Sequence, residues 1–371
     1  MRIACLTTSL SLDNGWGRYS YEIIRRLPDY GIEPVVFLDI SAPKANQDGF
    51  KSYSVLRSFS NGIRKPINLQ WDWLKIRSKI SNCHIVHCFA EPFMPLAYLA
   101  ASRNPKKLLV NAVGTYAFSS LNQKNSNLYY QAYKLAESIP TISHYVARLI
   151  NERLPEFADK LQVIPLGVNT EHIQLFPNHQ QFPKRENAFL AVGQVKARKG
   201  TLQAVEALAK VVEKFPEAKL YIAGSIAQTN YVQQVKNKIN ENNLENHVYF
   251  LGTVSTEELN YYYSRVRGLV MPSMNVGNSF EGFGLVHLEA NSFGVPSIGS
   301  LDCGNEDAIK DGYSGFLVEQ GNTDAIAQSM MKLLDPSFDW SSMSRNAINF
   351  AQSMSWNKVV ESYVNLYQSI A

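Results

Sequence analysis

Charge and cysteine are both scarce in this chain. Only 18% of its 371 residues are charged, and the formal net charge is +4. The chain therefore lacks the dense basic surface that nucleic-acid binding requires. Its four cysteines show no spacing typical of a secreted disulfide framework, which favours a reducing compartment.

Long apolar runs are absent as well. A spanning helix needs about 18–20 predominantly apolar residues, and the run at Met1–Leu6 soon meets Ser, Asp and Asn. That run also lacks the longer apolar centre and the cleavage site of a signal peptide. These absences predict a cytoplasmic protein, with peripheral contact on the inner membrane face as the alternative.

Short apolar runs instead alternate with helical patterns, which is typical of parallel α/β units buried on both faces. The predicted strands are Ile3–Thr7, Val35–Leu38, Ile85–Cys88, Leu108–Val110, Thr141–Ile142, Gln162–Ile164, Ala188–Val192, Lys219–Ala223, Val248–Leu251, Gly268–Met271, Ser297–Ile298 and Phe316–Val318. The predicted helices are Tyr19–Leu27, Leu128–Ala136, Thr201–Phe215, Tyr231–Asn242, Thr256–Val266, Gly284–Phe293 and Thr323–Leu334.

The polar stretch at residues 167–187 is the best candidate for a linker because it contains Pro177 and Pro183. It separates one α/β half at residues 1–166 from another at residues 188–354. At roughly 150 residues per domain, the length suits two domains better than one. Folds of this class bind ligands at domain interfaces and at the carboxyl ends of parallel strands, so we expect a ligand cleft between the halves.

The run from Glu281 to Ala290, Glu-Gly-Phe-Gly-Leu-Val-His-Leu-Glu-Ala, indicates chemistry. A predicted strand and loop precede it, and a predicted helix begins within it. At about 100° per residue, Glu289 lies some 80° round the helix axis from Glu281, so both carboxylates can border one elongated ligand. The N–H groups of Gly284 and Leu285 at the helix N-terminus form a natural seat for a diphosphate. The structural alternative makes Glu281 a helix-entry charge and Glu289 a solvated side chain.

This run resembles the Glu-x7-Glu motif of glycosyltransferase family 4, whose members are retaining enzymes of the GT-B fold. The likeness extends to the glycine loop Gly15–Tyr19, the interdomain strand Val163–Asn169, the basic loop Gly193–Gly200, the last strand Gly315–Val318 and the C-terminal helix Trp356–Tyr367. The resemblance implies two facing Rossmann-like domains with a cleft between them. The acceptor would bind residues 1–166, the nucleotide-sugar donor would bind residues 188–354, and a helix at 355–371 would cross back onto the first domain.

Residue by residue, the resemblance makes Glu281 and Lys199 catalytic, since Glu281 would hold the donor sugar and Lys199 would neutralise the diphosphate. It assigns donor binding to Glu289, Phe283, Gly284, Leu285, Arg198, Gln194 and Gly193. Fixed cations and amide dipoles would stabilise the charge that develops on the leaving nucleoside diphosphate. No Asp-x-Asp pattern, which holds a metal in the other main glycosyltransferase fold, occurs in the chain. We therefore expect neither a metal nor any other cofactor.

Two positions depart from the family pattern. Gln194 stands where the family has an arginine, and a glutamine supplies neither the charge nor the forked donors of that side chain. Arg198 or Lys196 could reach the same phosphates. Val113 stands where the family often has a histidine near the reacting sugar.

The glycine loop admits a second interpretation, as a dinucleotide fingerprint with Asp39. However, Ser20 replaces the third glycine and the loop from Thr8 is too long for that turn. In the family resemblance, Gly15, Gly17 and Arg18 form an acceptor or phosphate loop at a helix N-terminus.

Histidines and cysteines are concentrated in the run from Cys83 to Cys88. Alternate side chains of a strand face opposite ways, so this run predicts a buried strand rather than a zinc site. His87, near the end of that strand, and His144, near the next strand end, remain candidates for lining the cleft.

Residues 61–80 mix cations with Trp71 and Trp73. A basic aromatic helix of this kind can lie on an anionic membrane. The favoured interpretation is an ordinary helix with Trp71, Leu74 and Ile76 packed inward.

Taken together, these features predict a retaining hexosyltransferase that moves a sugar from a UDP- or GDP-linked donor to a hydroxyl of a glycan or lipid-linked acceptor. The alternatives are a non-catalytic GT-B module that binds a nucleotide or sugar, and a sugar-nucleotide epimerase of the same double fold.

Overall fold

The structure is a computed structural model that describes residues 1–12, 15–42, 49–57, 66–103, 106–114, 117, 127–171, 173, 185–227 and 229–371. The chain forms two compact units. One contains Met1–Leu166 together with Trp356–Ala371, and the other contains Gly167–Ser355. Within the predicted linker, residues 172 and 174–184, with Pro177 and Pro183, lie outside the described residues.

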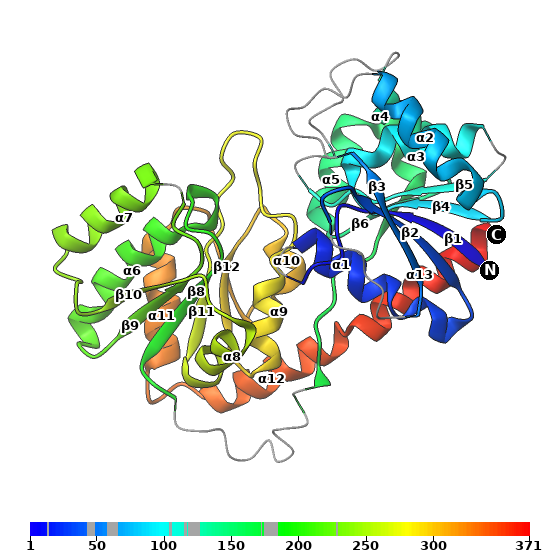
Figure 1. The fold of residues 1–371 in the computed structure, drawn as a ribbon. Coiled ribbons are helices and arrows are strands. Elements are labelled where there is room, and N and C mark those ends of the chain that lie inside the picture. Colours follow the sequence, from blue (N-terminus) through cyan, green and yellow to red (C-terminus); the bar gives the residue numbers. More distant parts are fainter. Residues whose placement is uncertain are drawn as a thin grey trace. The chain divides into compact units, whose positions relative to one another are not determined.

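The first unit is built on a parallel sheet in the order β3-β2-β1-β4-β5 (Figure 1). The strands are β1 (Arg2–Leu6), β2 (Glu33–Asp39), β3 (Lys51–Leu56), β4 (Ile85–Cys88) and β5 (Lys107–Val110). A smaller parallel pair, β6 (Ile139–Thr141) and β7 (Leu161–Val163), follows. The apolar runs predicted as strands form the buried middle of the main sheet.

Strand β3 was not predicted. Its sequence Lys-Ser-Tyr-Ser-Val-Leu alternates polar with apolar residues, and most of its side chains are half-buried. In the sheet formed by the described residues it is an edge strand that pairs with β2, so it does not carry the continuous apolar run that marks a central parallel strand.

Helices cover both faces of this sheet (Figure 1). The helices of the unit are α1 (Gly15–Ile24), α2 (Pro66–Ile80), α3 (Met94–Ser102), α4 (Leu128–Leu135), α5 (His144–Arg153) and α13 (Trp356–Ile370), with 3₁₀ turns η1 (Leu27–Tyr30), η2 (Glu91–Phe93) and η4 (Pro155–Lys160). Helix α13 contacts α1 and η1, whereas α2, α3 and α4 contact one another in series. The predicted C-terminal helix therefore belongs to the first unit.

The second unit contains a six-stranded parallel sheet in the order β10-β9-β8-β11-β12-β13. Its strands are β8 (Ala188–Val192), β9 (Lys219–Ala223), β10 (Val248–Gly252), β11 (Gly268–Val270), β12 (Ser297–Ser300) and β13 (Gly315–Val318). Its helices are α6 (Thr201–Lys214), α7 (Thr229–Glu241), α8 (Thr256–Arg265), α9 (Leu285–Ser292), α10 (Asn305–Ala308), α11 (Thr323–Leu334) and α12 (Trp340–Ser353), and η6 (Ala197–Lys199) precedes α6.

Two apolar cores hold this sheet. One packs α6, α7 and α11 against one face of the sheet, and the other packs α8 and α9 against the opposite face. The predicted fold class of two parallel-sheet, Rossmann-like domains is confirmed. Among the described residues, no helix combines the length and the hydropathy needed to span a bilayer. All four cysteines are buried and free.

Strand order places the loops that matter for binding. From β8 the chain continues to β9 and β10 on one side of the sheet. It then returns to β11, on the other side of β8, and continues outward to β12 and β13. Ligands of doubly wound sheets bind at such a reversal, outside the carboxyl ends of the strands. In the first sheet the corresponding reversal lies between β1 and β4.

Candidate active site

The loop after β8 brings the predicted cations to the carboxyl edge of the second sheet. Gly193 has a φ of +127°, and a Cβ there would lie 3.3 Å from Cε of Lys199. Gly200 ends η6 with a φ of +68°, and its Cβ would lie 1.9 Å from the carbonyl oxygen of Pro272. L-residues rarely adopt a positive φ, which favours glycine at both positions. At Gly200 the backbone of Pro272 also leaves no room for a side chain.

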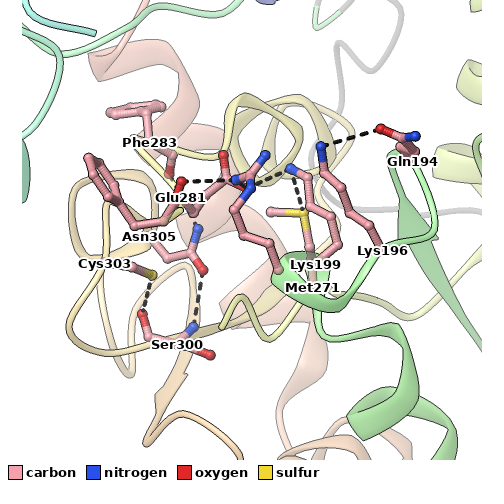
Figure 2. A network of polar contacts seen from close by, with 11 residues as sticks. Gln194, Lys196, Lys199, Met271, Glu281, Phe283, Ser300, Cys303 and Asn305 are labelled. Atoms are coloured by element: carbon pink, nitrogen blue, oxygen red, sulfur yellow. Dashed lines mark hydrogen bonds and ion pairs between the residues drawn. The ribbon is translucent and has the colours of Figure 1, made fainter. Parts of the chain in front are cut away.

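Glu281 lies at the centre of a charged cluster (Figure 2). Its Oε2 accepts hydrogen bonds from Nη1 of Arg198 at 2.7 Å and from Nζ of Lys199 at 2.6 Å. Burial alone would raise the pKa of Glu281. The positive charges of Lys199 and Arg198 outweigh that effect and lower the pKa from 4.5 to about 2, so the carboxylate stays ionised.

Positive charge is in excess in this cluster. Lys196, Arg198 and Lys199 provide three cations around the single carboxylate of Glu281. Burial, followed by the charges of Arg198 and Lys199, lowers the pKa of Lys196. Nζ of Lys196 donates to Oε1 of Gln194 at 3.3 Å. The residue that departs from the family pattern therefore contacts a lysine that could compensate for it.

The loop from Glu281 to Gly284 leads directly into α9. Gly284 is the residue before the helix and has a φ of +91°. The N–H of Gly304 donates to the carbonyl of Glu281 at 2.8 Å, and Nδ2 of Asn305 donates to the carbonyl of Phe283 at 3.3 Å. These two hydrogen bonds fix the loop that precedes α9 (Figure 2). The first N–H groups of α9 therefore follow directly after a fixed loop that ends in glycine. Such a helix N-terminus favours anions.

The other predicted donor residues lie along the same loop and helix. Phe283 is buried, whereas Leu285 and Glu289 are half-buried. Oε2 of Glu289 accepts a hydrogen bond from the hydroxyl of Tyr263 at 3.3 Å. Glu289 lies in the second turn of α9, whereas Glu281 lies in the non-helical loop four residues before the helix begins. The predicted angle of some 80° between them does not apply, because the helical repeat starts only after Gly284.

Sequence reasoning missed His287, which lies in the first turn of α9. The side chain is fully buried, and the side chain of Asn305 is its polar neighbour. Burial, with a further contribution from Lys199, lowers its pKa from 6.5 to about 3, so the ring is neutral. A histidine among the apolar residues between the two glutamates was the available sign. Lys199 has a further contact that the sequence did not suggest, with Sδ of Met271 at 3.5 Å.

In the first unit, Gly15 and Gly17 begin α1 as predicted. A Cβ on Gly17 would lie 2.2 Å from the carbonyl oxygen of Ser11, so the preceding loop crosses directly over this position. Nε of Arg18 donates to the carbonyl of Leu12 at 3.1 Å. The bond fixes Arg18 beside the same loop.

His87 does not offer a free ring nitrogen to a ligand. It is fully buried, with Nδ1 2.7 Å from the hydroxyl of Tyr367 and Nε2 2.9 Å from Oδ1 of Asn111. Since Oδ1 can only accept, Nε2 carries the proton and Tyr367 donates to Nδ1. The hydroxyls of Tyr19 and Tyr363 complete the network. Here a histidine predicted to line the cleft instead joins α13 to the sheet.

His144, the other histidine candidate, is exposed at the first position of α5, after the cap residue Ser143. No group of three or more His, Cys, Asp or Glu side chains among the described residues is arranged to hold a metal. A cavity of about 380 Å³ lies at the amino ends of β8, β9 and β10, where Asn187, Lys219 and His247 line it. Because it occupies the edge of the sheet opposite to the charged cluster, we do not assign the donor to it.

Two family models match nearly the whole chain. "Glycosyltransferase Family 4" matches residues 13–172, and "Glycosyl transferases group 1" matches residues 173–354. Among curated proteins, the poly(glycerol-phosphate) alpha-glucosyltransferase of Bacillus subtilis (strain 168) is 26% identical over 183 residues, which are 49% of this chain and 26% of that protein. The chain thus spans only about a quarter of the length of that relative.

Solved structures show the same fold over the full length. A glycosyltransferase from Rickettsia africae ESF-5 superposes with a TM-score of 0.77 at 19% identity, covering 100% of this chain and 98% of the other. Anabaena Alr3699/HepE in complex with UDP and glucose superposes with a TM-score of 0.74 at 16% identity, covering 100% of both chains. The parallel sheets and the two consecutive family matches agree with the motif resemblance: the chain belongs to glycosyltransferase family 4.

Proposed function

We propose that the protein is a retaining glycosyltransferase that transfers a hexose-type sugar from a UDP- or GDP-sugar to a hydroxyl of a glycan or lipid-linked acceptor. The excess of positive charge around Glu281, beside a glycine-capped helix N-terminus, carries this proposal. A nucleoside diphosphate is the kind of anion that such a site stabilises. The glucosyl activity in the name of the Bacillus subtilis relative and the UDP and glucose bound to the Anabaena protein support UDP-glucose as the first donor to test.

The geometry suggests how the second unit would act on the donor. Without donor, Arg198 and Lys199 share the carboxylate of Glu281. A bound diphosphate would become the new partner of these cations, which leaves the oxygens of Glu281 to accept hydrogen bonds from the sugar hydroxyls. As the bond between C1 and the diphosphate oxygen breaks, negative charge grows on the leaving group, where the cations stabilise it. The acceptor oxygen bonds to C1 in place of the diphosphate oxygen, and the proton of the acceptor hydroxyl passes to the released diphosphate.

The first test is release of free nucleoside diphosphate from UDP-, GDP- and ADP-sugars, with EDTA present. The wild type should release it from one donor, and Glu281→Ala should lower the rate on the order of 10²–10³-fold. Glu213→Ala serves as the matched control, because Glu213 is an exposed glutamate on α6 of the same unit. Equal rates in the wild type and Glu281→Ala would refute the proposed site.

The same assay separates the two alternative functions. A binding module would bind the nucleotide tightly but would release no product with any oligosaccharide or lipid-linked acceptor. An epimerase would convert the donor sugar without releasing free nucleoside diphosphate. Activity that is lost on adding EDTA would contradict the expectation that no metal is needed.

We also propose peripheral contact with a membrane through residues 61–80, of which 61–65 lie outside the described residues. The inward packing predicted for α2 is only partly correct: Ile76 is fully buried, but Trp71 is 52% exposed and Leu74 is 47% exposed. Lys75 and Arg77 are exposed on the same helix. Exposed Trp and Leu beside cations suit an anionic bilayer surface.

Co-sedimentation with vesicles tests this contact. The wild type should bind vesicles rich in phosphatidylglycerol more tightly than neutral ones, and Trp71→Ser with Leu74→Ser should weaken the binding. Trp73→Phe is the control, since Trp73 is buried on the same helix. If vesicle binding depends neither on lipid charge nor on the double substitution, α2 is not the contact.

A further inference from the structure

Glu91 is a buried acid that the proposed function has not used. It begins η2, directly after β4, and its side chain is fully buried. The loop after β4 flanks the reversal of strand order in the first sheet. This is the position in the first unit that the loop bearing Glu281, after β11, occupies in the second.

The carboxylate of Glu91 binds a turn of the neighbouring chain. Its Oε1 accepts hydrogen bonds from the N–H of Val113 at 2.6 Å and the N–H of Gly114 at 3.2 Å. Just before this turn, the N–H groups of Asn111 and Ala112 donate to the carbonyls of Cys88 and Pro140, as in a sheet. Glu91 therefore takes over the role of acceptor at the point where the bonds of the sheet stop.

An acid is a costly choice for this task. No salt bridge to Glu91 is seen among the described residues, and its Oε2 has no hydrogen-bond partner there. Burial raises the pKa of Glu91 from 4.5 to about 7, although the N–H groups of Val113, Gly114 and Glu91 itself lower it. A buried polar atom without a partner destabilises the fold, so its presence calls for an explanation.

The hydroxyl of Tyr133, on α4, is buried in the same neighbourhood. It too lacks a hydrogen-bond partner among the described residues, and the negative charge of Glu91 contributes to the raised pKa of Tyr133. Two buried polar groups from different elements are thus close enough for the charge of one to act on the other. Apolar packing alone would not select this pair.

We infer that Glu91 is a positioning residue for the acceptor: its carboxylate fixes the backbone of Val113 and Gly114 at the carboxyl edge of the first sheet, and it acts on transfer without acting on the donor. This inference rests on the proposed function for its link to catalysis. The link between Glu91 and the turn is a separate, physical claim. The two parts can therefore fail independently.

Three substitutions test the inference. Glu91→Gln keeps an acceptor oxygen for the two N–H groups, Glu91→Leu removes it, and Glu91→Asp withdraws it by one methylene. Glu152→Leu, on the exposed side of α5, is the matched control. Hydrogen exchange of the segment around Val113 and Gly114, nucleotide binding, donor hydrolysis without acceptor, and kcat and KM for the acceptor are measured for each.

Glu91→Leu should speed exchange at Val113 and Gly114 at least tenfold and lower kcat/KM for the acceptor on the order of 10- to 100-fold, since two buried N–H groups lose their partner. Nucleotide affinity and donor hydrolysis should stay within about twofold of the control. Glu91→Gln should restore both exchange and transfer. If Glu91→Leu does not fold, Glu91→Asp carries the test, with smaller changes in the same readouts.

Unchanged exchange at the turn in Glu91→Leu, or in Glu91→Asp, would overturn the inference. So would an equal loss of donor hydrolysis and acceptor transfer, which indicates a general structural defect. If the wild type releases no nucleoside diphosphate from any sugar nucleotide, the proposed function fails, and hydrogen exchange still decides whether Glu91 holds the turn.

Discussion

The two units place a buried glutamate at equivalent points of their sheets, yet they surround it differently. Glu281 follows β11, the neighbour of β8, and Glu91 follows β4, the neighbour of β1. Cations outweigh burial at Glu281, whose pKa falls to about 2. Only neutral N–H groups oppose burial at Glu91, whose pKa rises to about 7.

This difference shows what each place can bind. A carboxylate held by more cations than it can neutralise marks a site that is ready for an anionic ligand. At Glu91, burial without a nearby cation brings the pKa close to neutral pH despite the N–H groups that lower it, so this place does not favour an anionic ligand. The contrast agrees with a donor diphosphate on the second unit and a hydroxyl acceptor on the first. Four experiments test this contrast between the two glutamates.

Removing a cation from the Glu281 cluster should have the largest effect. Lys199→Gln removes one of the two charges that contact Glu281, so we expect kcat/KM for the donor to fall on the order of 10²–10³-fold. Steady-state kinetics and calorimetric titration with the nucleoside diphosphate measure this. Lys210→Gln is the control, because Lys210 on α6 takes part only in a solvent-exposed ion pair with Asp324 among the described residues. An unchanged kcat/KM would show that the cluster stabilises only the fold.

At acid pH, the free energy of unfolding should depend on the ionisation of Glu281. Its pKa is lowered from 4.5 to about 2 in the folded state, so it contributes stability above pH 4.5 that is lost as the pH falls towards 2. Integrated over that window, the contribution is at most about 3 kcal/mol. Urea denaturation of the wild type and Glu281→Gln between pH 2 and pH 6 should show a gap that narrows as the pH falls. A constant gap would contradict the ion cluster.

Near neutral pH, the free energy of unfolding should fall as the pH rises because of Glu91, which is the opposite of the effect of Glu281. The pKa of Glu91 is raised from 4.5 to about 7, so its contribution is fully present below pH 4.5 and is lost as the pH rises through 7. Glu91→Gln should match the wild type near pH 4.5 and become more stable above pH 7, by at most about 3 kcal/mol. The readout is urea denaturation between pH 4 and pH 8.5. A variant that is less stable at every pH would refute this sign.

The smallest effect should come from the neutral network of the first unit. Tyr367→Phe removes the hydroxyl that donates to Nδ1 of His87, which should cost about 1–2 kcal/mol of unfolding free energy because a buried acceptor loses its partner. Thermal and urea denaturation measure that loss. Nucleotide binding should not change, and a weakened affinity would mean that the network reaches beyond its own unit.

The apolar strands of the second sheet were predictable because a parallel strand that is buried on both faces has a continuous apolar sequence. Ala188–Val192 and Lys219–Ala223 were predicted to the residue. The edge strand β3 was not, since half of its residues are polar. Burial of Trp71 and Leu74 was predicted wrongly, because several rotations of one helix satisfy the same short pattern.

Lys199, Arg198 and Glu281 were selected by motif resemblance, and the structure brings their charged groups together. Their roles in catalysis remain predictions. Glu91 and Asn305 had no such motif. Glu91 contacts the backbone of Val113, and Asn305 contacts the backbone of Phe283, each 22 residues away in the chain. A single sequence carries no sign of a contact between a side chain and a distant backbone group.

The membership of α13 in the first unit has a consequence for biosynthesis. Tyr363 and Tyr367 supply hydroxyls to the buried network around His87 and Asn111, so that core cannot be completed until the ribosome has translated residues 356–370. The intervening unit, residues 167–355, is synthesised before them. Although domains generally fold in the order of their synthesis, here the N-terminal unit starts first and finishes last. A nascent chain that pauses before Trp356 would expose the partners of α13 to chaperones.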